Sequence, residues 1–263
     1  MGPRHRLGGL FSAAVFAILA TSPASVGAAT AQIVRTVPER VYRFAPRGEF
    51  RILEAYLRAL RSAREFIYLE NQFLWSPEIV AVLADKLRRP PTDGFRLLIL
   101  LPANPNNGAD DTRGQLGVLT EADDGAERLL ACSIYSLQGA RAKPVYVHAK
   151  VAIIDDAWLT VGSANLNEHS LFNDTEVNVI TCEREIAHGV RCRLWSEHLE
   201  LSPDDVSGDP AKAIDELWRP VADEQLQRLR AGAALSHKVV RLSGVSRRSR
   251  RLSGPINGFL VDG

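Results

Sequence analysis

The chain has 263 residues, of which 46% are hydrophobic and 24% charged, so it is long enough to bury the core of a folded domain. Its 32 basic and 31 acidic residues leave a net charge of +1, which gives no broad positive field for nucleic acid and argues mildly against a nuclease. The 3 cysteines, Cys132, Cys182 and Cys192, lack metal-ligand spacing, and their odd number excludes a full disulfide framework.

The N-terminus differs from the rest of the chain. Residues 1–31 resemble a signal peptide, with Arg4 and Arg6 before an apolar stretch from Leu7 to Ala20 and small residues up to Ala29. The apolar stretch is short for a membrane span. We therefore expect a secreted or extracytoplasmic protein, cleaved near Ala29 or Ala31. The alternative is a cytoplasmic protein whose leader is an artefact of a truncated gene.

The remaining pattern alternates between helical and extended segments. Apolar spacing and capping signals predict helices over residues 53–63, 77–87, 112–130, 185–199 and 211–229. Apolar or β-branched runs predict strands over 66–69, 95–101, 133–137, 145–154, 159–161 and 176–180. This alternation predicts an α/β sandwich with a central mixed sheet flanked by helices, spanning residues 32–236, with a basic C-terminal tail over residues 237–263.

The most informative segment is the predicted strand at 145–154, bounded by Pro144 and the pair Asp155-Asp156. Side chains alternate along a strand, so Tyr146, His148 and Lys150 share one face. Val145, Val147, Ala149, Val151 and Ile153 form the opposite, apolar face. A short turn and a return strand then lead into residues 162–167, where Ser163 and Asn165 could add uncharged donors to the same pocket.

This arrangement resembles the phospholipase D superfamily, whose motif is His-x-Lys, four residues and Asp, followed by Gly-Ser-x-Asn. The resemblance extends to residues 67–73, 75–78, 174–176 and 260–263, and it covers roughly residues 32–263. The chain is similar to the C-terminal half of a two-motif phospholipase D. Residues 32–38 already resemble the opening of that half, which is why the leader could be an artefact.

The resemblance implies a phosphodiesterase that hydrolyses phospholipid headgroups, or exchanges them, at a membrane surface through a phosphohistidine. It implies no metal and no cofactor. In-line attack on a phosphodiester needs a nucleophile on one side of phosphorus and a proton donor on the other. Since the chain has one motif, we expect a homodimer or a complementing N-terminal half. The alternatives are a single-motif homodimeric endonuclease and a catalytically silent truncated half-domain.

The resemblance also assigns roles to residues. His148 would be nucleophile or general acid, Lys150 and Asn165 would hold phosphoryl oxygens with help from Ser163, and Glu176 would orient the imidazole. Asp155 belongs to the motif, but on an unbroken strand it faces away from His148, so we expect it in a turn or a structural ion pair. Glu70, Asn71 and Gln72 are either pocket residues or a polar strand end that satisfies loop backbone.

Other segments are candidates for a second histidine or for a lipid contact. His5, His188, His198 and His237 lack the motif, and His169 is the nearest to it. The basic residues from His237 to Arg251 are either a solvated tail or a contact for anionic lipid headgroups. Residues 73–75 could insert among acyl chains, although for Trp75 packing on the following helix is favoured.

Overall fold

The computed structural model describes residues 29–104, 109–139 and 141–242. By its internal contacts the chain divides into residues 1–30 and residues 31–263, and the fold below belongs to the second unit. Three parts of the sequence lie outside the described residues: residues 1–28 of the predicted leader, which include His5, the arginines at 247–251, and the segment 260–263. No helix in the described part is long and apolar enough to cross a bilayer.

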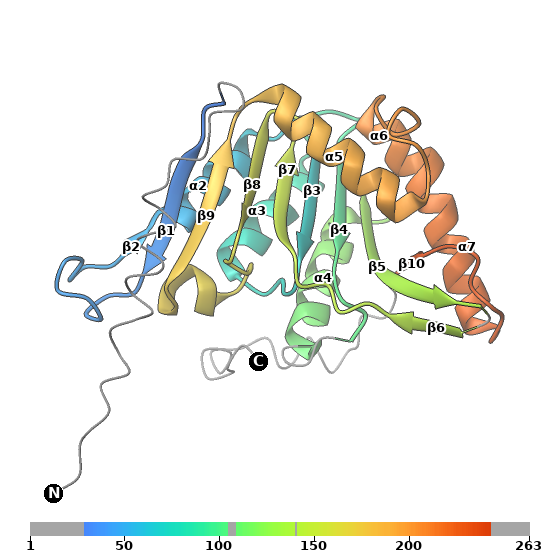
Figure 1. Ribbon diagram of the computed structural model, residues 1–263, viewed down its shortest axis with the longest axis horizontal. Coiled ribbons are helices and arrows are strands. Elements are labelled where there is room, and N and C mark those ends of the chain that lie inside the picture. The colour runs from blue at the N-terminus through green and yellow to red at the C-terminus, as the bar shows by residue number, and fades with distance from the viewer. Residues whose placement is uncertain (1–28, 105–108, 140, 243–263) are drawn as a thin grey trace, which may run out of the picture. The chain divides into compact units, whose positions relative to one another are not determined.

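A mixed sheet runs through the second unit, with strand order β10-β5-β4-β3-β7-β8-β9-β1-β2 and β6 paired with β5 (Figure 1). The strands β3, β4 and β5 are parallel to one another, and the other pairs are antiparallel. Their bounds are β1 Gln32–Val37, β2 Glu49–Phe50, β3 Phe66–Asn71, β4 Arg96–Leu100, β5 Leu129–Gln138, β6 Arg141–Pro144, β7 Lys150–Ile154, β8 Trp158–Gly162, β9 Glu176–Thr181 and β10 Val239–Arg241.

Helices cover both faces of this sheet (Figure 1). On one side lie α2 Arg51–Ser62, α3 Pro77–Arg88 and α4 Ala109–Asp123. On the other lie α5 Arg184–Leu199, α6 Pro210–Ala213 and α7 Arg219–Arg230, with a π-helical segment, η2 Ile214–Trp218, between the last two. The predicted α/β sandwich with a mixed central sheet is confirmed.

The strand β3 is buried on both faces. Ile67 and Leu69 belong to the core formed with α2, α3 and α4, whereas Phe66 and Tyr68 belong to the core formed with α5, η2 and α7. Burial of both faces explains why this strand is a continuous apolar run. The two strands paired with β3, which are β4 and β7, are therefore aligned on a fully buried strand.

Several predicted elements have different bounds in the structure: the strand expected over 133–137 begins at Leu129, and the helix expected over 211–229 is divided into α6, η2 and α7. The helix expected over residues 112–130 ends at Asp123, whose carboxylate accepts the backbone N–H of Arg128 at 3.1 Å, and the chain turns through Gly125 at φ +74. The strand expected from Val145 begins only at Lys150. Lys150 pairs with Asn71, the last residue of β3. Residues 145–149 therefore lie beyond the end of β3 and have no residue of that strand to pair with.

The C-terminal boundary also differs from the expected one. Val239–Arg241 form β10, which pairs with β5. Arg241 forms an ion pair with Asp223 at 2.6 Å, and Lys238 lies 3.6 Å from Glu200. Residues 237–242 therefore belong to the folded body and not to a tail.

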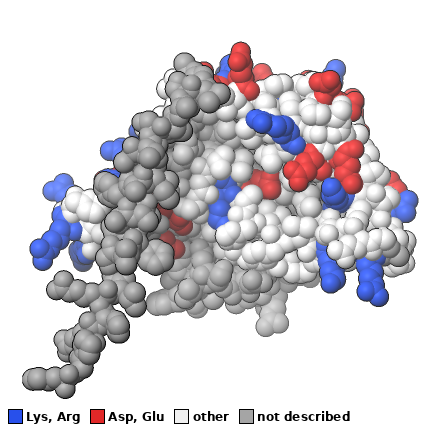
Figure 2. Space-filling model, viewed as in Figure 1, with Lys and Arg blue, Asp and Glu red and all other residues white. Residues whose placement is uncertain are grey.

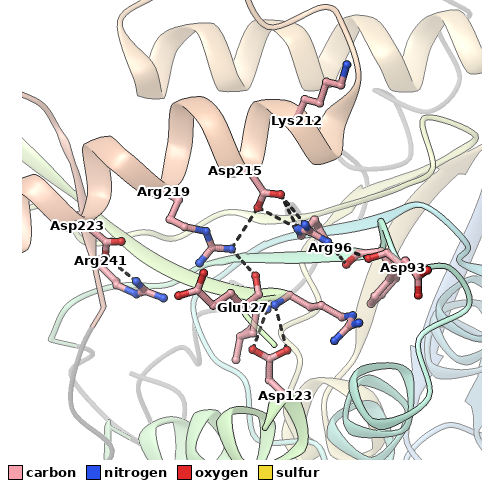
Figure 3. Close-up of polar contacts among 12 residues, drawn as sticks. Asp93, Arg96, Asp123, Glu127, Lys212, Asp215, Arg219, Asp223 and Arg241 are labelled. Carbon is pink, nitrogen blue, oxygen red and sulfur yellow. Dashed lines mark hydrogen bonds and ion pairs between the residues drawn. The ribbon is translucent and has the colours of Figure 1, made fainter. Parts of the chain in front are cut away.

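Ion pairs join the sheet to η2 and α7 (Figure 3). Arg96, the first residue of β4, donates to Asp215 at 2.6 Å, and Arg219 donates to the same carboxylate at 3.4 Å. Although burial opposes it, hydrogen bonding to Arg96 and the charge of that guanidinium lower the pKa of Asp215. These contacts lie at the N-terminal ends of β4 and α7.

A buried arginine on α5 joins this helix to two further segments. The Arg191 side chain is fully buried, donates to Asp156 at 2.8 Å and to the carbonyl of Val206 at 2.7 Å, and lies 4.8 Å from the Trp195 ring. Asp156 belongs to the turn between β7 and β8, so Arg191 fixes that turn against α5. Removing a buried charge partner leaves the other charge unpaired.

We expect Arg191→Met to lower the free energy of unfolding by about 3–5 kcal/mol, because it removes the guanidinium that pairs with Asp156 and donates to the carbonyl of Val206. Urea denaturation measures this change. Arg193→Met is the matched control, since Arg193 is an exposed arginine two residues along the same helix and should change stability by only about 0.5 kcal/mol. Equal effects of the two substitutions would contradict this account.

Candidate functional site

The predicted site residues gather at one edge of the sheet. Strands β3, β8 and β1 end at this edge, and β7 and β9 begin there, as the antiparallel pairings require. This edge therefore carries Asn71 and Gln72, the segment before Lys150, the loop after Gly162 and the start of β9 at Glu176. Ligand sites of open α/β sheets commonly lie beyond such strand ends.

Lys150 is the buried cation of this edge. Only 7% of the residue is exposed, and its Nζ donates to Gln72 Oε1 at 3.0 Å and to the carbonyl of His148 at 3.1 Å. A buried ammonium is stable only when its donors are satisfied. The contact with Gln72 joins β7 to the end of β3 and holds the ammonium in place.

His148 lies two residues earlier and is exposed. Its ring stacks near Tyr146, with centroids 6.3 Å apart and planes 22° apart, and the Tyr146 hydroxyl accepts a hydrogen bond from Gln72 Nε2 at 2.7 Å. Gln72 therefore contacts the residues on both sides of His148. The structure thus places the accessible His148 imidazole beside the fixed Lys150 ammonium. Gln72 forms hydrogen bonds both with the Lys150 ammonium and with Tyr146, whose ring lies near that of His148.

The loop after β8 is attached to β3 through Asn71. The Asn71 Oδ1 atom accepts the backbone N–H groups of Phe73 and Leu166, both at 3.2 Å. The Leu166 carbonyl in turn accepts the N–H groups of Trp75 and Ser76 at 2.9 and 3.0 Å. Asn71 thus satisfies loop backbone, and this contact fixes the position of the neighbouring Asn165.

Asn165 lies within this loop and is 5% exposed. Its Oδ1 atom is buried and has no hydrogen-bond partner in the described part of the chain. Buried polar atoms without a partner are uncommon in folded proteins. This oxygen is an acceptor, so it pairs only with a donor and not with a phosphoryl oxygen.

Ser163 and Glu176 contact each other. The Ser163 hydroxyl donates to one oxygen of Glu176, and the Ser170 hydroxyl donates to the other at 2.7 Å. Among the described residues, no hydrogen bond joins Glu176 to the His148 ring. The two serines fix the carboxylate, and orientation of His148 by Glu176 remains a prediction.

Asp155 lies away from the other motif residues. The five residues of β7 lie between Ala149 and Asp155, so Asp155 lies roughly 16 Å from Lys150 along the strand. Its carboxylate accepts the backbone N–H groups of Arg64, Glu65 and Phe66 at 2.7, 2.9 and 2.8 Å. The structure therefore places Asp155 in a turn that fixes the start of β3, and not beside His148 as a catalytic role would require.

Glu70 faces the opposite side of the sheet from Lys150. It pairs with Val151, accepts a hydrogen bond from Tyr68 at 2.8 Å, and lies 3.2 Å from His198 Nε2 on α5. Burial, together with the charge of Glu70, raises the pKa of Tyr68 well above its ordinary value. Among the three pocket candidates, Gln72 bonds the Lys150 ammonium through its side chain, whereas Asn71 pairs with Lys150 through the backbones of β3 and β7.

The other histidines do not add a second motif. His198 is bound to Glu70, and His188 lies 3.0 Å from Asp156 at the far end of β7. His169 has a buried Nε2 atom with no partner among the described residues, within the π-helical turn η1 His169–Asn173. No group of three or more His, Cys, Asp or Glu side chains that could hold a metal ion occurs in the described ranges.

The segment after β3 is buried. Phe73, Leu74 and Trp75 are at most 1% exposed, so they pack inside the fold and cannot insert among acyl chains.

Two residues of the site have only weak signals in the sequence. No motif marks Ser170 or Asn178, yet Ser170 donates to Glu176, and Asn178 Oδ1 accepts the N–H of Ala164 at 3.2 Å. The position of Asn178 opposite Gly162 in β9 is the signal that could have revealed it.

The geometry agrees with a comparison against known families. Residues 56–197, more than half of the 263, match the family described as "Cardiolipin synthase, PLD-like domain". The chain belongs to this phospholipase D-like family. The match includes His148, Lys150 and Asn165, and membership places the PLD-like chain in a superfamily of phosphodiesterases.

Two curated relatives are phospholipases D. The PLD-like chain is 26% identical over 275 residues to phospholipase D C of Dictyostelium discoideum, which covers 80% of this chain and 17% of the relative. It is 25% identical over 262 residues to phospholipase D zeta 2 of Arabidopsis thaliana, covering 72% and 25% respectively. The chain therefore spans between a sixth and a quarter of the length of these relatives.

Among solved structures, NucT from Helicobacter pylori is similar at 20% sequence identity and a TM-score of 0.47. The alignment covers 64% of the PLD-like chain and 94% of NucT.

We expect Gly162→Ala to lower the free energy of unfolding by about 2 kcal/mol, because the added methyl group would overlap the Asn178 side chain and the Val177 carbonyl. Gly189→Ala is the control, since no atom lies within 4 Å of the added group and alanine favours the helix. Thermal or urea denaturation of both variants measures the difference. An unchanged stability in Gly162→Ala would show that the loop can shift away from β9.

Proposed function

We propose that the chain is a phospholipase D-type phosphodiesterase that hydrolyses phospholipid headgroups, or exchanges them with an alcohol, through a phosphohistidine. The observation that carries the proposal is the exposed His148 imidazole beside the buried Lys150 ammonium. An imidazole must be accessible to reach phosphorus, whereas a charge that stabilises phosphoryl oxygens acts best when it is fixed in advance.

The chemistry requires a second imidazole. The His148 ring nitrogen would attack phosphorus while the bond to the headgroup oxygen breaks and a second imidazole protonates the leaving alcohol. Water, or an acceptor alcohol, would then lose a proton to that imidazole, attack phosphorus and release His148. The Lys150 ammonium and the NH2 group of the Asn165 amide would donate hydrogen bonds to the phosphoryl oxygens in both steps.

We propose that a second copy of the chain supplies this imidazole. Three exposed apolar side chains support this assembly: Ile33, Val179 and Val161 lie opposite one another across β1, β9 and β8, and they are 66%, 46% and 45% exposed. An apolar row of this kind on a sheet face is typical of a protein–protein contact. A two-fold axis would bring the same motif to the site twice.

A mixing experiment tests the shared site. Wild type and His148→Ala are unfolded together in equal amounts, refolded and assayed for phosphatidylcholine hydrolysis on each fraction of a sizing column. If every site needs two His148 rings, random pairing leaves about one quarter of the wild-type activity, confined to the dimer. Retention of about one half would show that each chain works independently.

The same assay separates the remaining alternatives. His148→Ala alone should lose all activity while keeping its stability, because the side chain is exposed and forms no hydrogen bond in the described structure. Cleavage of plasmid DNA without action on phosphatidylcholine would indicate the homodimeric nuclease. A folded protein that is inert towards both would be a silent half-domain or a subunit awaiting another chain.

We also propose an extracytoplasmic location, supported by the signal-peptide pattern of residues 1–31. N-terminal sequencing of the mature protein tests it. A new terminus near Ala29 or Ala31 would support export, and an intact Met1 would contradict it.

A further inference from the structure

The loop between β1 and β2 has an unusual surface. Residues 38–48 contain Arg40, Arg43 and Arg47, all exposed, against the single acidic residue Glu39. Between these arginines lie Val41 and Phe44, which are 60% and 66% exposed, and Tyr42, which is 38% exposed. Cationic and large apolar side chains thus alternate on one short loop.

This loop is folded, so the exposure of its apolar residues is part of its structure. Backbone hydrogen bonds join Ala45 to Tyr42 at 3.2 Å and Gly48 to Ala45 at 3.0 Å, and Ala45 is buried. Gly48 adopts φ +68, and a Cβ there would lie 2.7 Å from the Val37 carbonyl. The loop is therefore held in a conformation that turns Ala45 inward and leaves Val41 and Phe44 in solvent.

Two contacts attach the loop to the sheet. The Tyr42 hydroxyl lies 3.1 Å from Thr175 Oγ1, one residue before Glu176. Arg35 is paired with Glu49 at 2.7 Å and lies 5.7 Å from the Phe44 ring. The loop is thus fixed next to the part of the site that contains Glu176.

The topology places this loop on the site edge. β1 ends at the same edge as β3 and β8, and three strand spacings separate β1 from β7, or roughly 14 Å. Figure 2 shows Lys and Arg side chains gathered at the end of the molecule where Figure 1 places the β1–β2 connection. The exposed Val41 and Phe44 therefore belong to a loop that begins at the site edge, at the end of the sheet formed by β1 and β2.

We infer that this loop docks the protein on an anionic phospholipid surface, with Val41 and Phe44 entering the boundary between headgroups and acyl chains. Arg40, Arg43 and Arg47 form no ion pair in the described part of the chain and would contact lipid phosphates. Adjacent cationic and apolar side chains are the combination that binds such an interface. The choice of lipid agrees with the proposed function, but docking itself requires no turnover.

A single-stranded nucleic acid is the competing partner, and the structure favours it less. Binding of single strands depends on aromatic rings that stack with bases, and an aliphatic residue such as Val41 offers no such stacking. It also depends on a groove of positive charge that follows the backbone, whereas this chain has a net charge of +1. A compact patch with a net excess of two positive charges suits a headgroup layer better.

Sedimentation with lipid vesicles tests the inference in the full chain carrying His148→Ala, so that turnover does not alter the lipid. One variant combines Val41→Ser with Phe44→Ser, and a second combines Arg40→Gln, Arg43→Gln and Arg47→Gln. The control for the apolar variant is Leu201→Ser, at an apolar residue that is 39% exposed. The control for the arginine variant combines Arg58→Gln, Arg61→Gln and Arg88→Gln, at three exposed arginines on α2 and α3.

We expect the apolar variant to bind vesicles of phosphatidylcholine and phosphatidylserine roughly tenfold more weakly than its control. The arginine variant should lose roughly 100-fold at low salt, because each arginine near an anionic surface contributes about fivefold. The arginine effect should shrink as salt is added and should be absent on pure phosphatidylcholine. Binding equal to that of the controls would overturn the inference.

Two further measurements distinguish the alternatives. If the loop variants keep vesicle binding but lose affinity for a single-stranded oligonucleotide, the loop is a nucleic-acid contact and the inference is wrong. In chains with His148 intact, the loop variants should hydrolyse short-chain phosphatidylcholine dispersed as monomers at the wild-type rate and lose activity only on vesicles. If wild type hydrolyses no phosphatidylcholine while loop-dependent vesicle binding persists, the proposed function fails and the docking surface stands.

Discussion

The antiparallel pairing of β7 with β3 determines which residues can meet at the candidate site. Its register places Lys150 opposite Asn71 at one end and Ile154 opposite Ile67 at the other. Both ends are fixed by side chains: Asp155 accepts three backbone N–H groups at the start of β3, and Lys150 donates to Gln72 beyond its end. A shift of one residue would turn every side chain of β7 to the opposite face of the sheet, so the motif depends on this register.

The same pairing separates two polar clusters that are adjacent in sequence. Because side chains alternate along β3, Glu70 points towards α5 and pairs with His198, whereas Asn71 lies on the side of Lys150 and binds the loop after β8. Hydrogen bonds join the members of each cluster, although Asn71 Nδ2 and Asn165 Oδ1 have no partner in the described part of the chain. The strand thus presents the hydrogen-bonded Glu70 and His198 on one face and the residues that hold the site on the other.

At the site edge, fixed and accessible groups are divided between elements in a way that suits phosphoryl chemistry. Lys150, Gln72 and Asn71 are buried and hydrogen-bonded, and they hold the loop with Asn165, while His148 is exposed in a segment without regular secondary structure. A preorganised charge beside an accessible imidazole needs little rearrangement when a phosphoryl group binds there. Two surfaces near this edge are distinct. The proposed partner chain would contact the exposed row on β1, β9 and β8, whereas the proposed lipid surface would contact the arginine-rich β1–β2 loop.

The sequence by itself determined the alternating elements, the sandwich and the motif, because apolar periodicity and the spacing of His148, Lys150 and Asn165 are local properties of the chain. It also indicated that Asp155 would face away from His148, since strand alternation is local as well. The strand start at Lys150, the pairing of Glu70 with His198, the serine contacts of Glu176 and the strand β10 required the tertiary structure. Each depends on which segment lies beside which after folding, and residues as far apart as Glu70 and His198 carry no local signal of their contact.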